Sequence, residues 1–163
     1  MAEPLLPPKL LARLEVEEFY GDYIACLDEA RIEEWPDFFA EEASYRVVSR
    51  ENWEAGLPIS IFLCRNRRQI QDRVASYLEA NIYPDQWNRH LISAVQLTDV
   101  RENEIFVASN YGILQTRQDG ETRIYQSGRC YDRLVRTDGR LRIHSRELVY
   151  DTHAVATLFV MPI

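Results

Sequence analysis

The feature that most constrains this chain is the change to a two-residue pattern in its second half. That period places the apolar side chains on one face of a half-buried strand. Short turns separate the patterned segments, and the Asp-Gly pairs at 119–120 and 138–139 provide the positive φ angles that tight hairpins need. We therefore predict a meander of four long antiparallel strands. The segments are 89–100, 104–117, 122–137 and 141–155.

The first half of the chain shows helical spacing instead. Between Lys9 and Ala30, apolar side chains recur at steps of three and four residues, so they share one face of a long helix. Pro36 is expected to disrupt or end a short second helix. The other predicted elements are that short helix at 31–39, strands at 43–52 and 58–64, and a third helix at 65–81.

Helices followed by a sheet define the α+β class. A long first helix that lies in the concavity of a curved sheet would bury the apolar faces of both, and this arrangement has the shape of a cone. We predict one such domain over residues 9–163, preceded by a loose arm at 1–8 that holds three prolines. Bulky side chains are available to plug the cone, namely Phe19, Phe38, Phe39, Ile105 and Phe106.

The composition is that of an ordinary globular protein. Of the 163 residues 46% are hydrophobic, and the formal net charge of −7 argues against a nucleic-acid-binding face. No basic segment followed by a long apolar stretch opens the chain, and no apolar run approaches the ~20 residues of a membrane helix. The three cysteines form neither a CxxC motif nor a disulfide framework. We expect a cytoplasmic protein that binds neither nucleic acid nor membrane.

The sequence offers poor ligands for a metal or cofactor. An iron–sulfur site with mixed ligands needs two cysteines and two histidines, yet no histidine follows any of the three cysteines within three residues. His90, His144 and His153 are too scattered for a site of two histidines and one carboxylate. Neither a GxSxG nucleophile motif nor a phosphate-binding glycine loop is present. We therefore predict no metal-binding, cofactor-binding or nucleophilic residue in this chain.

Acid–base chemistry inside the cone is the competing enzymatic hypothesis. Tyr20 and Tyr23 lie on the apolar stripe of the first helix, which is more typical of a core. Asp132 lies between Cys130 and Leu134 in the two-residue pattern, so it can face inward, where desolvation would tune its pKa. The full set of candidates is Tyr20, Tyr23, Asp37, His90, Asp132 and His144.

The polar face of the predicted sheet is rich in arginine and tyrosine. A solvated surface explains this, but the same residue types are frequent in protein–protein interfaces. His144 alternates with Arg142 and Arg146 and is predicted on this face. The arginines and tyrosines predicted on this polar face are Arg129, Arg133, Arg146, Tyr125 and Tyr131. Trp53, Trp87 and Phe62 are predicted in or beside loops, where they would contact a partner or the domain's own core.

From about Leu11 to its end, the chain resembles the small (β) subunit of bacterial aromatic-ring-hydroxylating oxygenases. The resemblance rests on the order and spacing of three stretches. They are "EEFYGDYIACLDEARIEEWPDFFAEEASYRV" at 17–47, "RHLISAVQL" at 89–97 and "SGRCYDRLVRTDGRLRIHSRELVYDT" at 127–152. The resemblance implies a cystatin-like cone of the nuclear transport factor two superfamily, in agreement with the pattern.

The resemblance also implies a division of roles between two subunits. In this family the large α subunit carries a Rieske 2Fe–2S cluster and a mononuclear Fe(II), and ferredoxin or reductase partners supply its electrons. The β subunit is a non-catalytic scaffold that forms a trimer and joins three α subunits in an α3β3 hexamer. We expect Val149–Thr152 to be structural, with Asp151 holding the last turn. The residues expected to contact other subunits, or to belong to the core, are Trp53, Trp87, Arg89, His90, Arg129 and Tyr131.

Overall similarity favours complexes that hydroxylate small aromatic acids such as salicylate, anthranilate or benzoate. The alternative function is a stand-alone dehydratase or isomerase with the same cone fold. That enzyme would need an open apolar pocket of ~300–1,000 Å³ with converging polar groups. The scaffold predicts instead a filled cone and self-assembly.

Overall fold

The predicted meander is present in the structure. The computed structural model describes residues 6–80 and 86–151, and four long strands form its second half. They are β3 (Gln86–Val100), β4 (Glu104–Arg117), β5 (Thr122–Thr137) and β6 (Arg140–Tyr150). Each pairs antiparallel with the next, and Gly120 and Gly139 at two of the turns have positive φ angles. The last predicted strand, 141–155, corresponds to β6, which ends at Tyr150. Residues 152–155 of that prediction lie outside the described residues.

The first strand of the chain lies beside the last one. β1 (Phe39–Ser49) runs parallel to β6 and antiparallel to β2 (Phe62–Cys64), so the sheet order is β2-β1-β6-β5-β4-β3. β1 ends earlier than predicted because Ser49 caps a short helix, α2 (Arg50–Glu54), by accepting a hydrogen bond from the Asn52 amide at 3.2 Å.

Of the three aromatic residues predicted in or beside loops, Phe62 and Trp87 lie beside loops at the starts of β2 and β3. Trp53 lies in the short helix α2. Phe62 is buried, whereas Trp53 and Trp87 are exposed, so only the last two are available to a partner.

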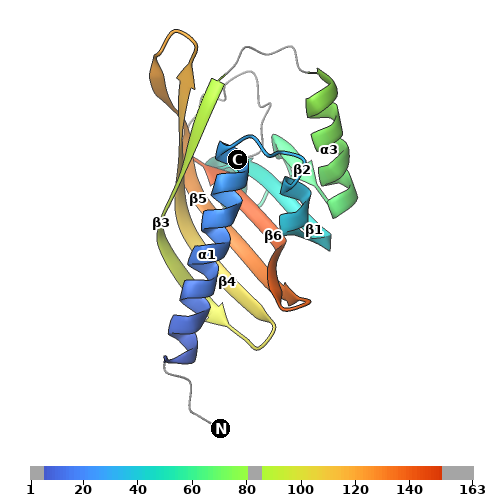
Figure 1. The fold of residues 1–163 in the computed structure, drawn as a ribbon, viewed down its shortest axis with the longest axis vertical. Coiled ribbons are helices and arrows are strands. Elements are labelled where there is room, and N and C mark those ends of the chain that lie inside the picture. The colour runs from blue at the N-terminus through green and yellow to red at the C-terminus, as the bar shows by residue number, and fades with distance from the viewer. Residues whose placement is uncertain (1–5, 81–85, 152–163) are drawn as a thin grey trace.

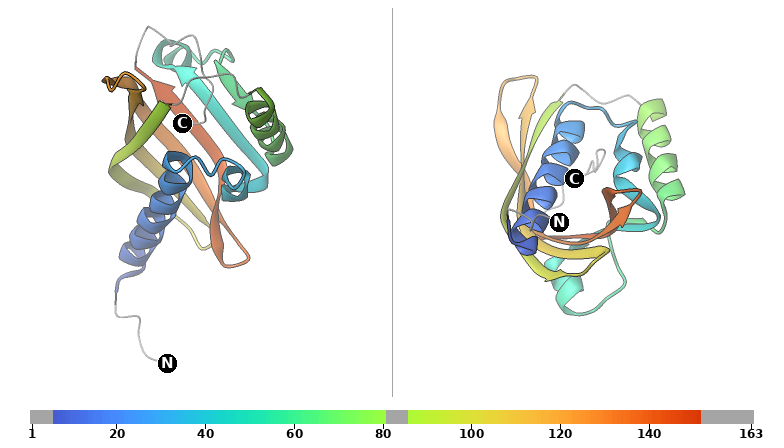
Figure 2. Two further views of the ribbon diagram at one scale, coloured as in Figure 1. Left: turned by 45° about the horizontal axis from the view of Figure 1, so that its top comes forward. Right: turned by 60° about the horizontal axis from the view of Figure 1, so that its bottom comes forward.

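The long first helix lies in the hollow of the sheet, as predicted. α1 (Pro8–Asp28) begins with a proline, whose fixed φ suits a first helical turn, and the sheet curves around it (Figure 2). The 3-10 helix η1 (Trp35–Phe38) and α3 (Arg67–Ala80) complete the helical side (Figure 1). The α+β cone is therefore confirmed. Within the described residues, no helix is both long enough and apolar enough to cross a membrane.

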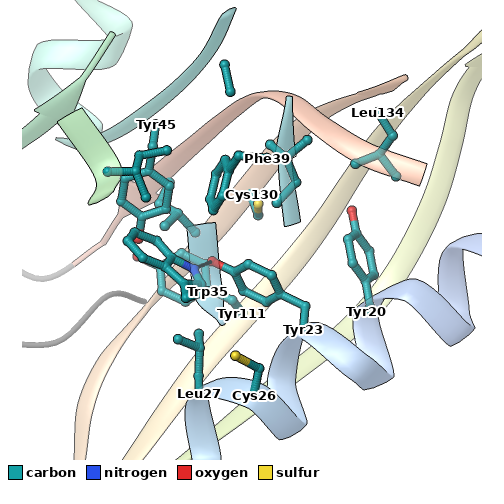
Figure 3. Close-up of a cluster of buried hydrophobic side chains, with 14 of the residues drawn as sticks. Tyr20, Tyr23, Cys26, Leu27, Trp35, Phe39, Tyr45, Tyr111, Cys130 and Leu134 are labelled. Atoms are coloured by element: carbon teal, nitrogen blue, oxygen red, sulfur yellow. Dashed lines mark hydrogen bonds between the residues drawn. The ribbon is translucent and has the colours of Figure 1, made fainter. Parts of the chain in front are cut away.

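Aromatic rings fill the cone between α1 and the sheet. Trp35, Phe39 and Tyr45 are fully buried, and their ring centroids lie 5.1, 5.3 and 5.9 Å apart in edge-to-face contacts. Tyr20 and Tyr23 point from α1 into the same core (Figure 3). Phe39 and Ile105 are among the residues that fill the cone, as expected.

Phe106 was expected to plug the cone but lies on the other side of the sheet. Neighbouring residues of a strand face opposite sides, so the burial of Ile105 inside the cone directs Phe106 outward. The Phe106 ring lies 5.1 Å from the Arg101 guanidinium carbon and 5.9 Å from that of Arg133.

A register shift between β5 and β6 decides which polar side chains face inward. Leu134 pairs with Ile143 and Arg133 pairs with Ser145, which leaves His144 as an extra residue in β6. This bulge reverses the alternation, so Ile143 and Arg146 both face the interior although they are three residues apart. The prediction that Arg146 lies on the polar face was therefore wrong, because regular alternation cannot anticipate a bulge.

Candidate functional site

The centre of the cone holds a buried ion pair. Asp132 on β5 and Arg146 on β6 are directly paired across the two strands. Arg146 Nε donates to Asp132 Oδ1 at 2.9 Å and Nη2 donates to Oδ2 at 2.7 Å, which is a bidentate arrangement. The arginine side chain is 2% exposed and the aspartate side chain 0%. The prediction that Asp132 faces inward is confirmed.

Aromatic side chains of α1 and η1 close over this pair. The Tyr20 hydroxyl donates to Asp132 Oδ2 at 2.6 Å, and the Tyr23 ring centroid lies 4.1 Å from the Arg146 guanidinium carbon. The Trp35 indole N–H donates to the Tyr23 hydroxyl at 2.9 Å (Figure 3). Tyr20 and Tyr23 are thus core residues, as their place on the apolar stripe predicted.

Burial and charge fix the protonation states of Tyr20 and Arg146 in this network. Burial raises the pKa of Tyr20 well above its ordinary value and the Asp132 carboxylate raises it further, so the phenol stays protonated. Burial alone would lower the pKa of Arg146, but Asp132 outweighs it, and the pKa lies well above its ordinary value. Both oxygens of Asp132 already accept hydrogen bonds from Arg146. These contacts hold the carboxylate inside the packed interior of the cone.

A second polar pair joins the end of α1 to β3. His90 Nδ1 lies 2.6 Å from Asp28 Oδ1, and the His90 amide donates to the same oxygen at 3.1 Å. The His90 side chain is 7% exposed, and its Nε2 has no hydrogen-bond partner within the described part of the chain. An imidazole oriented by a carboxylate is the arrangement of many general bases. The same contacts also fix the end of α1 on the sheet.

The remaining acid–base candidates lie away from both pairs. Asp37 is exposed on η1 and forms an ion pair with Arg67 of α3. His144 is half-buried in the bulge of β6. The six candidates therefore divide between a closed network, a helix–strand contact and the surface.

The ligand chemistry of the described residues does not fit a Rieske cluster or a mononuclear iron. No three His, Cys, Asp or Glu side chains converge as possible ligands within residues 6–80 and 86–151. Cys26, Cys64 and Cys130 are buried free thiols. Burial raises the pKa of Cys26 to about 11, so this thiol is protonated at neutral pH and is a poor metal ligand.

Known proteins with the same pattern and fold identify the family. The family model described as Ring hydroxylating beta subunit matches residues 24–157. The chain belongs to the ring-hydroxylating β-subunit family. It is 42% identical to the anthranilate 1,2-dioxygenase small subunit of Burkholderia cepacia, over 91% of this chain and 92% of that one. It is 27% identical to the terephthalate 1,2-dioxygenase terminal oxygenase component subunit beta 1 of Comamonas sp, over 94% of this chain and 100% of that one.

A crystal structure supports the same assignment. It is described as the β subunit of an aromatic-ring-hydroxylating dioxygenase from Novosphingobium aromaticivorans, and it matches this chain with a TM-score of 0.88 at 36% sequence identity. The match covers 96% of this chain and 100% of that one. The β subunit described here is therefore a component of a dioxygenase system.

The β subunit carries an aromatic and charged cluster on the outer face of its sheet. Trp53 of α2 stacks on Tyr131 of β5, with ring centroids 5.1 Å apart and an interplanar angle of 5°. The Arg129 guanidinium carbon lies 5.6 Å from the Tyr131 ring. Glu147 accepts hydrogen bonds from Trp53 at 3.0 Å and from Arg46 at 2.8 Å. Three of the six predicted contact residues are thus neighbours in space.

The other three predicted contact residues lie on β3. Trp87 is 54% exposed and the Arg89 side chain is 63% exposed, whereas the His90 side chain is 7% exposed and contacts Asp28 of α1. Sequence reasoning missed Glu147, which joins Trp53 of α2 to the sheet, and Arg46 of β1, which pairs with Glu147. Their positions differ by 101 in the chain, so no local pattern relates them.

Proposed function

We propose that this β subunit is the non-catalytic scaffold on which the large catalytic subunits of a ring-hydroxylating oxygenase assemble. The observation that carries the proposal is the closed network at the centre of the cone. Asp132, Arg146 and Tyr20 satisfy one another's hydrogen bonds there, which supports a structural role for this network. Membership of the β-subunit family supports the same role.

The proposed complex is an α3β3 hexamer in the cytoplasm. Its large subunits would bind the Rieske 2Fe–2S cluster and the mononuclear Fe(II) and receive electrons from ferredoxin or reductase partners. Three β subunits would form the base on which they sit. The poor fit of the described Cys, His and carboxylate residues to iron supports this division.

The proposed substrate of the complex is a small aromatic carboxylate. Relatives of this chain belong to systems named for anthranilate and terephthalate, at 42% and 27% identity. Both substrates are aromatic acids. The large subunit would contact the substrate, and this chain would act on the reaction only through assembly.

The deciding experiment is co-expression of this chain, carrying an affinity tag, with the large subunit of its own system. We expect an equimolar complex in which iron travels with the large chain and aromatic-acid-dependent oxygen consumption is present. The isolated tagged chain should contain no stoichiometric iron and show no turnover. A chain that does not bind the large subunit contradicts the proposal.

The alternative enzyme is tested by the Asp28–His90 pair, which alone retains an acid–base arrangement among the described candidates. A stand-alone dehydratase or isomerase would lose turnover in His90→Gln with its fold intact. The scaffold proposal expects His90→Gln to leave the kcat of the assembled complex within about twofold. A loss of kcat greater than about 100-fold in a variant that still assembles would contradict the non-catalytic role.

A further inference from the structure

β2 is an edge strand whose outer side is left open. Among the described residues it pairs with β1 alone, at one end of the strand order. Part of the main chain of an edge strand points away from the sheet, so its N–H and C=O groups can pair with a strand of another chain. Proteins commonly blunt such edges with charged side chains or proline. β2 contains neither, and the apolar residues Ile61 and Leu63 are 40% and 38% exposed.

The helix α3 turns this open edge into a groove. The space between β2 and α3, which lie next to each other in Figure 1, has a volume of about 490 Å³, and we call it the β2–α3 groove. Residues 61–65 form one wall. Because side chains of both strand faces are included, the main-chain edge itself borders the groove. Side chains spaced three and four residues apart on α3 form the other wall, namely Gln69, Asp72, Arg73 and Ser76.

The β2–α3 groove carries positive charge on a chain that is acidic overall. Arg65 and Arg73 line it, and neither guanidinium forms an ion pair with a described residue. The Arg73 guanidinium carbon lies 4.7 Å from the Phe62 ring centroid, which holds this cation beside the edge strand. Asp72 is the one carboxylate among the described lining residues, whereas the net charge of the chain is −7. The groove therefore favours an occupant that brings a carboxylate.

We propose that an extended segment of the large subunit lies in the β2–α3 groove and adds a strand to the free edge of β2. Its main chain would pair with the edge, and its apolar side chains would cover Ile61 and Leu63. A carboxylate of the same segment would lie beside Arg65 and Arg73. In this mode of recognition the main-chain hydrogen bonds give affinity and the side-chain contacts give specificity. This inference rests on the proposed scaffold function and identifies one place where the large subunit is held.

Charge argues against a second copy of this chain as the occupant. A pairing of β2 with β2 of another copy would be two-fold symmetric, so each surface residue would meet its own counterpart or a close neighbour of it. The arginines of both grooves would then lie near one another, and like charges across an interface oppose binding. A segment of different sequence that carries a carboxylate avoids this repulsion.

Hydrogen–deuterium exchange tests the main-chain pairing directly. The isolated full chain is compared with the complex obtained by co-expression with the large subunit of its own system. We expect the amides of Phe62–Cys64 to exchange at least about tenfold more slowly in the complex, because pairing protects them from water. Equal exchange rates in the two samples overturn the inference. Exchange that is equally slow in the isolated chain also overturns it, because the edge would then already be covered without the large subunit.

Two double variants test the side-chain contacts. Ile61→Lys/Leu63→Lys places charges along the edge strand, as protected edges do, and Arg65→Glu/Arg73→Glu reverses the charge of the groove. Each should lower the association constant for the large subunit by more than about tenfold, as expected for central apolar and charged contacts. Mass photometry of the purified complexes over a dilution series measures this constant. Circular dichroism of each isolated variant confirms its fold.

α3 also supplies the matched control variants. Leu78→Lys introduces the same charge as the edge variant, and Arg68→Glu makes the same reversal as the groove variant. Both residues are exposed on α3 but do not line the groove. We expect the controls to keep the association constant within about twofold of the parent value. Groove variants that bind the large subunit as tightly as these controls overturn the inference.

Failure of this inference is distinct from failure of the scaffold function. If the complex forms at full mass while the amides of β2 exchange as in the isolated chain, the groove contact is wrong and the scaffold function stands. If the parent chain does not bind the large subunit at all, the scaffold function is wrong, and the occupant proposed for the groove falls with it.

Discussion

At the residue scale, the Asp132–Arg146 pair determines what the interior of this β subunit can do. Removing an ion from water into a protein interior costs roughly several kcal/mol, and only well-placed partners offset that cost. The pair contains two such ions. Here the bidentate contact, the Tyr20 hydroxyl and the Tyr23 ring provide those partners. The same partners occupy the groups that a catalytic carboxylate would need to keep free.

Breaking this pair should therefore destabilise the fold strongly. Asp132→Asn leaves Arg146 buried without its counter-ion, and we expect a loss of about 3–5 kcal/mol in the free energy of unfolding. Tyr20→Phe removes one hydrogen bond to a charged group and should cost about 1.5–3 kcal/mol. The double variant Asp132→Leu/Arg146→Met should cost less than the Asp132→Asn change alone, because no charge remains unpaired.

Urea unfolding of the isolated chain measures these differences. The enzymatic hypothesis expects a different pattern, in which Tyr20→Phe and Asp132→Asn abolish turnover and leave both the unfolding free energy and the assembly unchanged. Observation of that pattern would show that the network is catalytic.

The residues of this network were only partly predictable from the sequence. Tyr20 and Tyr23 follow the helical stripe and Asp132 follows the strand alternation, so periodicity placed all three inside. Arg146 was missed because the bulge at His144 has no clear signature in the residue types around it. A physical rule could have found the partner. A buried aspartate needs a cation, and the neighbouring strand offers Arg142 and Arg146 within reach of its register.

At the scale of elements, the approach of β5 to β6 depends on one glycine. A Cβ atom at Gly128 would lie 2.0 Å from the Val149 carbonyl oxygen, which is backbone and cannot move aside. Gly128→Ala should therefore destabilise the protein by more than about 3 kcal/mol, at or above the upper end of ordinary overpacking. Gly112→Ala on β4 is the matched control, because no atom lies within 4 Å of its Cβ position. The control should change stability by no more than about 1 kcal/mol.

Chemical denaturation of both variants checks this prediction, and near-equal midpoints for the two would contradict it.

The element boundaries themselves were easiest to predict where turn chemistry is local. The β4 and β5 bounds, 104–117 and 122–137, coincide with the segments delimited by their turns. The end of β1 was missed, because the Ser49 cap that diverts the chain into α2 competes with a β-rich local sequence.

At the scale of the whole molecule, the position of β6 ties the two ends of the described chain together. β6 lies between β1 and β5, and its parallel pairing with β1 joins residues about one hundred positions apart, such as Val47 and Leu148. The sequence predicted the meander and the helix inside it, but not this parallel neighbour, because non-local pairing leaves no local pattern. The consequence is that neither the helical half nor the meander has a complete core of its own.

The protein should therefore unfold as one cooperative unit. The variant Trp53→Phe/Trp87→Phe leaves Trp35, which is fully buried, as the only tryptophan of the chain and makes its fluorescence a probe of the cone interior. Far-ultraviolet circular dichroism reports the sheet independently. We expect the two probes to give the same urea midpoint at a fixed protein concentration, as two-state unfolding requires. The concentration is held fixed because self-association raises the apparent stability. Separate midpoints, with fluorescence changing before the sheet is lost, would mean that α1 and η1 detach from a sheet that is stable alone. The cone would then be two folding units and not one.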